Sequence, residues 1–302
     1  RMAALEAIVK LRPTKPFPGS SYVPAALGFF AASSGVRHAL VAGPNIEQAR
    51  DLAGMLATAG FETDTATTGK ELLRLATRSP DYELAWIDVS INHPEIGALL
   101  QELRRDWRTA SLRVGLVARS GYSEQAERVA RLDPMAKTFA RPHDEQAFRW
   151  QLEQLATLRP QEFVDFDARQ RQAAESLDLL AELSQSSGKL YDLQRVQDSV
   201  LAALYNPKLA VKATTVLANL NSAESQRALV EVASRFTLPL ELRQAAAKAF
   251  LQNMEKHGIL LTTEEIRKQY QRYNESEKQD AATQRVLGLI LDCIEASART
   301  KP

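Results

Sequence analysis

The sequence contains only one cysteine, Cys293, which excludes an internal disulfide and a metal centre built of several thiolates. We expect Cys293 to be a small buried side chain. No apolar run approaches the ~18 residues that a membrane-spanning helix needs. The formal net charge is +1, and basic residues are interspersed with acidic ones, so neither nucleic acid nor a membrane surface is expected as a partner.

The motifs of common enzyme classes are also missing. The chain has no G-x-x-x-x-G-K-S/T phosphate loop, no G-x-G-x-x-G nucleotide-binding turn and no G-x-S-x-G nucleophile motif. We therefore expect no enzymatic activity and no cofactor. With 302 residues, of which 45% are hydrophobic and 25% are charged, the chain has a globular composition and enough length for one to three domains.

Between about residues 36 and 158, short apolar runs alternate with amphipathic segments. The apolar runs predict strands, and the segments with apolar residues at every third or fourth position predict helices. Because parallel strands need crossover helices, this alternation predicts an α/β fold with a doubly wound, five-stranded parallel sheet. Ligands of such sheets bind beyond the carboxyl ends of the strands. The predicted strands end near Ala42, Ala66, Asp88, Ala118 and Ala140.

Asp88 stands at the end of the third predicted strand, where the run LAWIDVSIN changes from apolar to polar. This spacing resembles the receiver domain of bacterial response regulators, which has a flavodoxin-like fold. The resemblance covers residues 36–158 and implies that Asp88 holds the phosphoaccepting position. It also implies that Arg141, followed by Pro142, holds the position of the family's lysine. Trp86, on the same strand as Asp88, is expected to pack in the core.

The other functional positions of the family are changed in this chain. The acidic pair that binds magnesium falls on Ala42 and Gly43, and the hydroxyl-bearing residue falls on Val117 or Ala118. Magnesium needs about two anchoring oxygens in near-octahedral geometry, and neither alanine nor glycine supplies one. Phosphoryl transfer also depends on groups that stabilise the developing charge. The resemblance therefore favours the fold and argues against the chemistry.

Asp88 can be interpreted in three ways. We favour a vestigial carboxylate that pairs with the Arg141 guanidinium, which would hold it ionised and occupied. The alternative is a working phosphoacceptor served by a histidine kinase. A transition-metal site of His93 and His143 with Asp88 or Asp144 is a weaker hypothesis, because loop histidines usually face solvent. We therefore expect no metal.

From about residue 159 to 302 the sequence is almost wholly helical by its apolar period. A basic or polar residue followed by small residues and an apolar run recurs at 171, 212, 243 and 279. Small residues at fixed places let neighbouring helices approach closely, and stacked helix pairs bury a continuous core. The segment NPKLAVKATTVLANL resembles HEAT-type repeats, which implies an α-solenoid. A generic helical bundle is the alternative.

Residues 1–35 carry the same signature, in RMAALEAIVKL, and YVPAALGFFAAS resembles the first helix of another pair. We predict that the helix at 22–33 packs antiparallel on the helix at 168–185. The receiver-like domain, 36–158, would then be inserted within one repeat of an all-α domain formed by 1–35 and 159–302, which is tolerated because domain termini lie close together.

Two classes of function follow from these patterns. The favoured one is a non-enzymatic signalling scaffold, in which a receiver-like domain without phosphorylation chemistry is combined with HEAT-like repeats that bind a protein partner. Self-association through the receiver-like domain is a further mode of binding. The alternative is a response regulator that accepts phosphate on Asp88 and transmits the change to the helices. We expect a cytoplasmic location and a longer parent protein, in which a targeting segment could precede Arg1.

Overall fold

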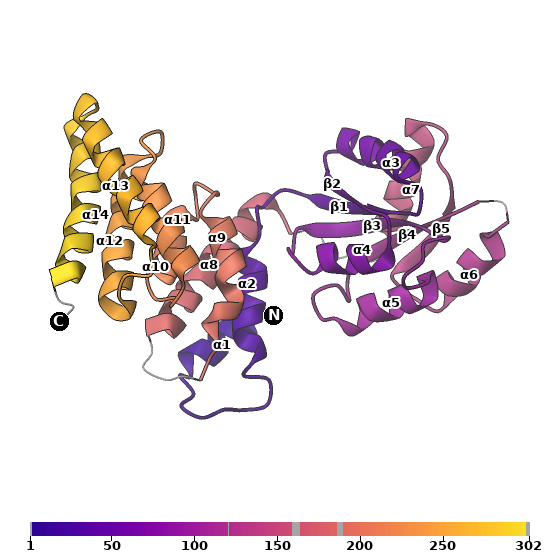
Figure 1. The fold of residues 1–302 in the computed structure, drawn as a ribbon. Coiled ribbons are helices and arrows are strands. Elements are labelled where there is room, and N and C mark those ends of the chain that lie inside the picture. Colours follow the sequence, from indigo (N-terminus) through magenta and orange to yellow (C-terminus); the bar gives the residue numbers. More distant parts are fainter. Residues whose placement is uncertain (1, 120, 159–163, 186–189, 300–302) are drawn as a thin grey trace. The chain divides into compact units, whose positions relative to one another are not determined.

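The computed structural model describes residues 2–119, 121–158, 164–185 and 190–299. Spatial contacts divide the chain into two compact units. Unit 1 is formed by Arg1–Ala32 together with Arg171–Pro302, and unit 2 by Ser33–Gln170, so unit 2 interrupts the sequence of unit 1 (Figure 1). In the described part of the chain, no helix is both long and apolar enough to cross a bilayer.

Unit 2 contains the predicted five-stranded parallel sheet. The strands lie in the order β2-β1-β3-β4-β5, and every neighbouring pair is parallel. This order is that of the flavodoxin-like doubly wound fold. Each of the five strands ends where the sequence predicted, so the strand positions and the fold class are confirmed for this unit. The strands are β1 His38–Ala42, β2 Glu62–Ala66, β3 Tyr82–Asp88, β4 Arg113–Ala118 and β5 Ala136–Ala140.

Helices cover both faces of the sheet (Figure 1). β3 alternates its side chains between two apolar cores, because successive residues of a strand point to opposite faces. Leu84 and Trp86 belong to the first core, and Ala85 and Ile87 to the second. The first core includes side chains of α3 (Ile46–Thr58) and α7 (Glu145–Ala156); the second includes side chains of α4 (Gly69–Ala76), α5 (Ile96–Arg105) and α6 (Ser123–Arg131).

Trp86 is fully buried in the first core, as predicted. Its ring stacks on Phe139 at a centroid distance of 5.2 Å and lies 5.1 Å from the ring of Phe148. The indole also covers Gly115 of the neighbouring strand, where a Cβ atom would lie 2.9 Å from a ring carbon. The sheet therefore needs glycine at position 115, because any side chain there would displace the indole.

Three helices of unit 2 begin with a side-chain cap. Asn45, Thr68 and Asp144 each accept a hydrogen bond from the backbone N–H three residues further on, at 3.2, 3.3 and 2.7 Å. Such caps satisfy amide groups that have no partner inside the helix. α5 and α6 differ, because Glu95 and Tyr122 at their N-cap positions make no side-chain cap bond.

Unit 1 is helical. Its helices are α1 Met2–Lys10, α2 Tyr22–Ala31, α8 Phe166–Gln185, which begins in unit 2, α9 Gln197–Ala203, α10 Ala210–Leu217, α11 Ala223–Ser234, α12 Leu240–His257, α13 Thr263–Glu275 and α14 Ala281–Arg299, with short 3-10 helices η1 Leu193–Val196 and η2 Ser276–Lys278. α2, α9 and α11 adjoin along one row, and α10, α12 and α14 along another. Between the rows, α9 pairs with α10, α11 with α12 and α13 with α14.

Small residues of the recurring motif are buried in the helices of unit 1. Ala173, Ala213 and Ala246 are each 0% exposed. α2 also makes a close approach, since a Cβ atom on Gly28 would lie 3.0 Å from Val196 of η1. α2 thus adjoins η1 and α9, and its antiparallel packing on α8 stays a prediction.

Polar side chains tie the helices of unit 1 together. Asn253 of α12 is buried and donates to the backbone carbonyls of Leu217 at 2.8 Å and Leu220 at 2.7 Å. Gln226 of α11 donates to the Asn253 side-chain oxygen at 3.0 Å. One buried amide therefore joins three helical segments. Cys293 is buried on α14, as predicted, and burial raises the pKa of its thiol to about 11.

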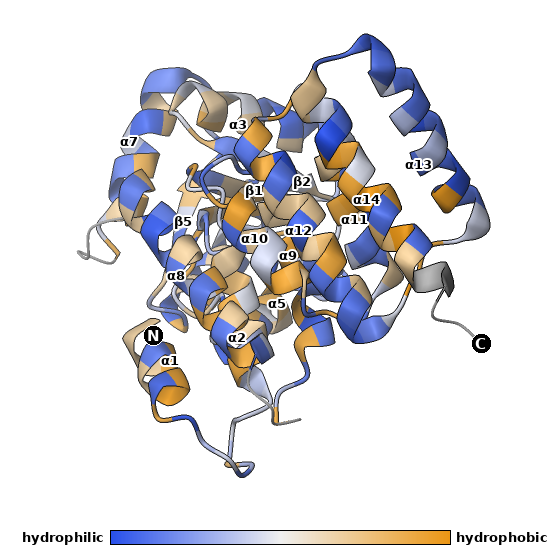
Figure 2. Cartoon of the chain, turned by 90° about the vertical axis from the view of Figure 1, so that its left-hand side faces the viewer, coloured by the Kyte–Doolittle hydropathy of each residue, from blue (hydrophilic) through white to orange (hydrophobic). Residues whose placement is uncertain are grey.

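α13 is hydrophilic over most of its length (Figure 2). Two ion pairs join it to α11: Arg227 with Glu265 at 2.7 Å and Arg272 with Glu231 at 2.6 Å. The hydrogen bond from Arg272 is the main reason why the pKa of the Glu231 carboxyl is lowered. These side chains are partly exposed, so each pair contributes little to stability.

The edges of unit 2 differ from the predicted ones. The unit begins at Ser33 rather than near residue 36, and it ends at Gln170 rather than near residue 158. The reason is a set of long-range hydrogen bonds: Gln170 donates to the Ser34 carbonyl at 2.5 Å, and Arg169 donates to Glu83 at 2.5 Å. The sequence pattern showed where the last helix of the α/β alternation ends, and it held no signal for these contacts.

Candidate functional site at the carboxyl ends of the strands

Asp88 lies at the carboxyl end of β3, the central strand, between β1 and β4. Its side chain is 14% exposed. One carboxylate oxygen, Oδ1, accepts hydrogen bonds from the backbone N–H of Ser90 at 2.9 Å and from the Ser90 hydroxyl at 2.5 Å. The turn that follows the strand therefore holds the carboxylate, and the other oxygen faces Arg119.

Arg119 is the basic residue beside Asp88. It directly follows β4, and its Nε atom lies 4.0 Å from Asp88 Oδ2. At that distance the two groups attract each other without a hydrogen bond. The guanidinium instead donates to Gln48 Oε1 at 2.7 Å, and 51% of the Arg119 side chain is exposed. The pair is therefore loose and partly hydrated.

Arg141 does not pair with Asp88, so that prediction is wrong. Arg141 Nη2 donates to the backbone carbonyl of Gln48 at 3.2 Å and lies 3.8 Å from Asp51 Oδ2. Both acceptors belong to α3. The backbone after β5 is where the resemblance placed it, with Pro142 buried, but the long side chain is held by the acceptors of the helix.

The two positions of the acidic pair face different surroundings. Ala42 is 2% exposed and packs in the second core with Leu40 and Ala66. Gly43 lies against Asp88, because a Cβ atom on Gly43 would be 3.0 Å from the Asp88 Cβ atom. Position 43 therefore faces the carboxylate, whereas position 42 faces apolar side chains.

The hydroxyl position holds no donor. Val117 pairs in register with Asp88 and packs in the first core, whereas Ala118 is 8% exposed and packs in the second. The hydroxyl that contacts Asp88 comes instead from Ser90, two residues further along the chain.

The two loop histidines do not come together. His93 precedes a cis proline, Pro94, and its carbonyl accepts from the Lys70 amide at 2.7 Å. His143 is exposed, and its Nε2 atom lies 3.1 Å from Asp144 Oδ2. No group of three His, Cys, Asp or Glu side chains is close enough to bind a metal ion within the residues that the structure describes.

Three residues of this rim were not identified from the sequence: Ser90, Arg119 and Gln48. A signal for Arg119 existed, because the residue directly follows a strand, and such residues line the carboxyl edge of a parallel sheet. Gln48 had none, because its helix packs against β1 and β2, and its side chain meets Arg119 only in the folded chain. Gln48 bonds Arg119 through its side chain and Arg141 through its carbonyl.

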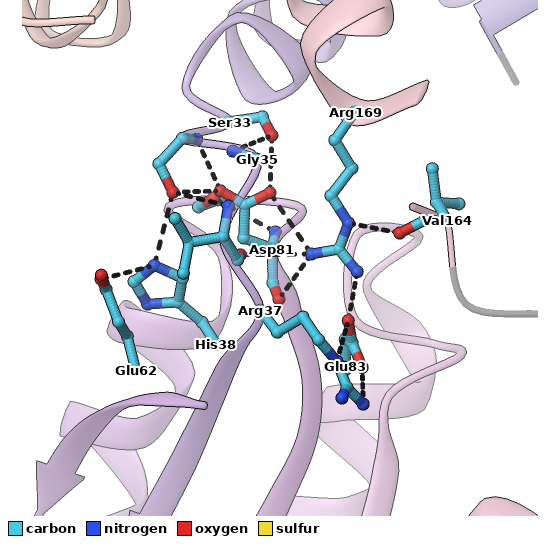
Figure 3. Close-up of polar contacts among 12 residues, drawn as sticks. Ser33, Gly35, Arg37, His38, Glu62, Asp81, Glu83, Val164 and Arg169 are labelled. Carbon is cyan, nitrogen blue, oxygen red and sulfur yellow. Dashed lines mark hydrogen bonds and ion pairs between the residues drawn. The ribbon is translucent and has the colours of Figure 1, made fainter. Parts of the chain in front are cut away.

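A second polar cluster lies at the opposite, amino end of β3 (Figure 3). Arg169 donates to Glu83 Oε1 at 2.5 Å and lies 3.5 Å from Asp81 Oδ1. The side chains of Arg169, Asp81 and Glu83 are only 6, 1 and 3% exposed. This cluster could not be predicted from the sequence, because the acids of DYELAW stand at the start of a strand and give no sign of burial.

The segment that leads into unit 2 supplies the remaining bonds of the cluster (Figure 3). The Ser33 hydroxyl donates to Asp81 Oδ1 at 2.6 Å, and the Ser34 amide to Asp81 Oδ2 at 2.6 Å. Arg37 Nη2 donates to Glu83 Oε2 at 2.9 Å. Buried charges are costly unless they are paired and hydrogen-bonded, and both acids here are. The cluster fastens the incoming and outgoing segments to one strand.

No family model matches the chain, and no curated protein matches it. Among solved structures, it is similar to a sensor protein from Polaromonas sp. JS666, with 24% identity over 41% of this chain and 98% of that chain and a TM-score of 0.35. It is similar to the chemotaxis response regulator CheY4 of Vibrio cholerae, with 14% identity over 40% and 98% and a TM-score of 0.36. It is also similar to a CheY-like receiver domain from Methylobacillus flagellatus, with 20% identity over 40% and 98% and a TM-score of 0.34.

Proposed function

We propose that the chain is a non-enzymatic signalling protein, in which a receiver-like unit without phosphorylation chemistry is combined with helical repeats that bind a protein partner. The observation that carries the proposal is Gly43, which occupies the position facing Asp88 and leaves the carboxylate without a second acid. Magnesium is held by two or more anchoring oxygens, so a single carboxylate is a weak site.

The partners of Asp88 support the same conclusion. Its Oδ1 atom already accepts two hydrogen bonds from Ser90, one of them at 2.5 Å. The nearby cation, Arg119, is half exposed and 4.0 Å away. Attack on a phosphodonor needs positive groups that stabilise the transferred phosphoryl oxygens, and a loosely placed, hydrated guanidinium does this poorly.

The proposal is tested by treating the protein with magnesium and acetyl phosphate, and separately with beryllofluoride as a phosphoryl mimic. We expect no magnesium-dependent rise in Tm, since a ligand raises Tm only when it binds the native state. We also expect no acyl phosphate on Asp88 by mass spectrometry, with Asp88→Asn as the matched control. Phosphate on Asp88 within minutes would establish the response-regulator alternative instead.

Substitutions at the acidic-pair positions sharpen the test. Gly43→Asp together with Ala118→Thr places a second carboxylate and a hydroxyl at the rim, and we expect it to restore measurable magnesium binding. Ala42→Asp places a carboxylate in the second core, so we expect it to lower stability without restoring magnesium binding. Equal magnesium binding by the two variants would contradict the geometry assigned to position 43.

For unit 1 we propose a HEAT-type solenoid as the protein-binding scaffold. Support comes from the two helix rows, the buried small residues and the grouping of α1 and α2 with the C-terminal helices. Repeats that contact only their neighbours lose stability in steps. Deleting α13 and α14 should therefore leave the remaining helices folded by circular dichroism, whereas a single-core bundle would lose its cooperative transition.

A further inference from the structure

A hollow of about 640 Å³ opens at the carboxyl ends of β4 and β5, beside α6. The strands line it with Ala118, Thr138 and Ala140, whose small side chains leave the space unfilled. Pockets for small ligands have volumes of roughly 300–1,000 Å³, so the hollow is large enough for a small organic molecule.

Thr138 lines this hollow and carries a hydroxyl group that protein atoms cover. Its hydroxyl oxygen is buried and has no hydrogen-bond partner among the described residues. Buried hydroxyl groups in native proteins nearly always have a partner, and an unpaired one costs free energy. If the Thr138 side chain turns its hydroxyl group toward the hollow, a hydrogen bond to a bound molecule would remove that cost.

Arg119 and Arg141 stand at the mouth of the hollow with donors to spare. Their nearest carboxylate oxygens are 4.0 and 3.8 Å away, whereas the Arg104 guanidinium elsewhere in unit 2 lies 2.9 Å from its acid. Each donates one hydrogen bond to Gln48, and a guanidinium has five N–H donors. Gln48 thereby holds the two cations at the same place.

Acids accompany the cations around the mouth, because Asp88 lies 4.0 Å from Arg119 and Asp51 lies 3.8 Å from Arg141. The acid that lines the hollow, Glu127, is exposed and lies 3.4 Å from Arg131, which offsets its charge. α6 begins at Ser123 without a side-chain cap, and the amino end of a helix carries a partial positive charge. An oxyanion that binds at this opening competes with Asp88 and Asp51, whose distances to the two guanidinium groups are longer than a hydrogen bond.

We propose that the hollow binds a small organic molecule that carries one oxyanion group on an apolar body. The oxyanion, a carboxylate or a phosphate, is held by Arg119 and Arg141, because guanidinium groups bind planar pairs of oxygens through two parallel hydrogen bonds. The apolar body lies on Ala118 and Ala140, and a polar substituent reaches Thr138. Unit 2 then senses a soluble anion, which goes beyond the proposed scaffold function.

The test is calorimetric titration of the full chain with phenyl phosphate, with inorganic phosphate and phenol as separate arms. We expect phenyl phosphate to bind at least tenfold more tightly than either fragment, because the site holds both the oxyanion and the ring. Arg141→Gln should weaken binding about tenfold or more, and Thr138→Phe should abolish it by filling the hollow. Arg128 is an exposed arginine of α6 that does not line the hollow, so Arg128→Gln should leave the affinity unchanged.

Several results would overturn the proposal. These are absence of binding at millimolar phenyl phosphate, equal affinity in wild type and Arg141→Gln, and equal affinity for inorganic phosphate and phenyl phosphate. If Thr138→Phe fails to fold, the comparison of Arg141→Gln with Arg128→Gln still decides the outcome. Asp88→Asn should bind phenyl phosphate at least as tightly as wild type, which separates this site from phosphorylation of Asp88.

Discussion

The two ends of strand β3 hold acids in opposite circumstances. At the amino end, Asp81 and Glu83 are 1 and 3% exposed, and arginine donates to Glu83 at 2.5 and 2.9 Å. At the carboxyl end, Asp88 is 14% exposed and its arginine lies 4.0 Å away. The first end is a closed network in which every charge is paired, and the second is open to water.

We infer that the amino end of β3 contributes to the stability of unit 2, whereas its carboxyl end is available for binding. Breaking a buried ion pair leaves an uncompensated charge, so the amino end resists change. At the carboxyl end, Arg119 and Arg141 lose little when they change acidic partners, because their ion pairs with Asp88 and Asp51 are long and partly exposed. Two guanidinium groups that can change partners beside a hollow are suited to binding a ligand.

The largest expected effect is at the closed end. Arg169→Met leaves Asp81 and Glu83 buried with fewer partners, and we expect the free energy of unfolding to fall by about 3–5 kcal/mol. Urea unfolding followed by circular dichroism measures it. Arg128→Met, on an exposed helix face, is the control and should change stability by less than about 0.5 kcal/mol. A loss below about 1 kcal/mol for Arg169→Met would remove the contrast between the two ends.

An intermediate effect is expected at Tyr82, the first residue of β3. Its hydroxyl donates to Asp64 Oδ2 at 2.7 Å, and Tyr82→Phe should cost about 1 kcal/mol. Burial first, and then the bond to Asp64, raise the pKa of Tyr82 above its ordinary value. A group whose pKa is higher in the folded state stabilises the fold at pH values below its unfolded pKa, and this contribution is lost as pH rises above that value.

An ultraviolet absorbance titration of wild type and Tyr82→Phe tests whether the pKa of Tyr82 is raised. The difference between the two curves should appear only at a pH above that at which free tyrosine ionises, which is about 10. A difference centred at the ordinary tyrosine value would show that the phenol is not protected by burial.

The smallest expected effect is at the open end. Asp88→Asn keeps an oxygen that can accept the Ser90 bonds and removes only the charge. Because the ion pair with Arg119 is long and hydrated, we expect the free energy of unfolding to change by less than about 0.5 kcal/mol. A loss of more than about 2 kcal/mol would place Asp88 in a tight pair like those at the amino end.

The sheet could be predicted because its information is local. The strand ends from Ala42 to Ala140 follow from apolar runs that stop at polar turns, and their parallel order follows from the helices between them. The partner of Asp88 could not be predicted in the same way. Arg141 has the right position in the chain, but the Gln48 carbonyl and Asp51 compete for its guanidinium, and that competition exists only in three dimensions.

The cluster around Arg169 could not be predicted either, because its contacts also exist only in the folded chain. Its members come from residues 33–37, 81–83 and 164–169, and no local pattern relates them. An arginine at the start of a helix usually faces solvent, so its 6% exposure becomes apparent only in the fold.

The contact between Gln170 and the Ser34 carbonyl has a consequence for protein engineering. The last residue of unit 2 bonds to the second residue of the unit, so the whole segment is a cassette with adjoining ends. Such a cassette can be removed and replaced by a two-residue turn, or exchanged for a reporter protein whose termini are equally close.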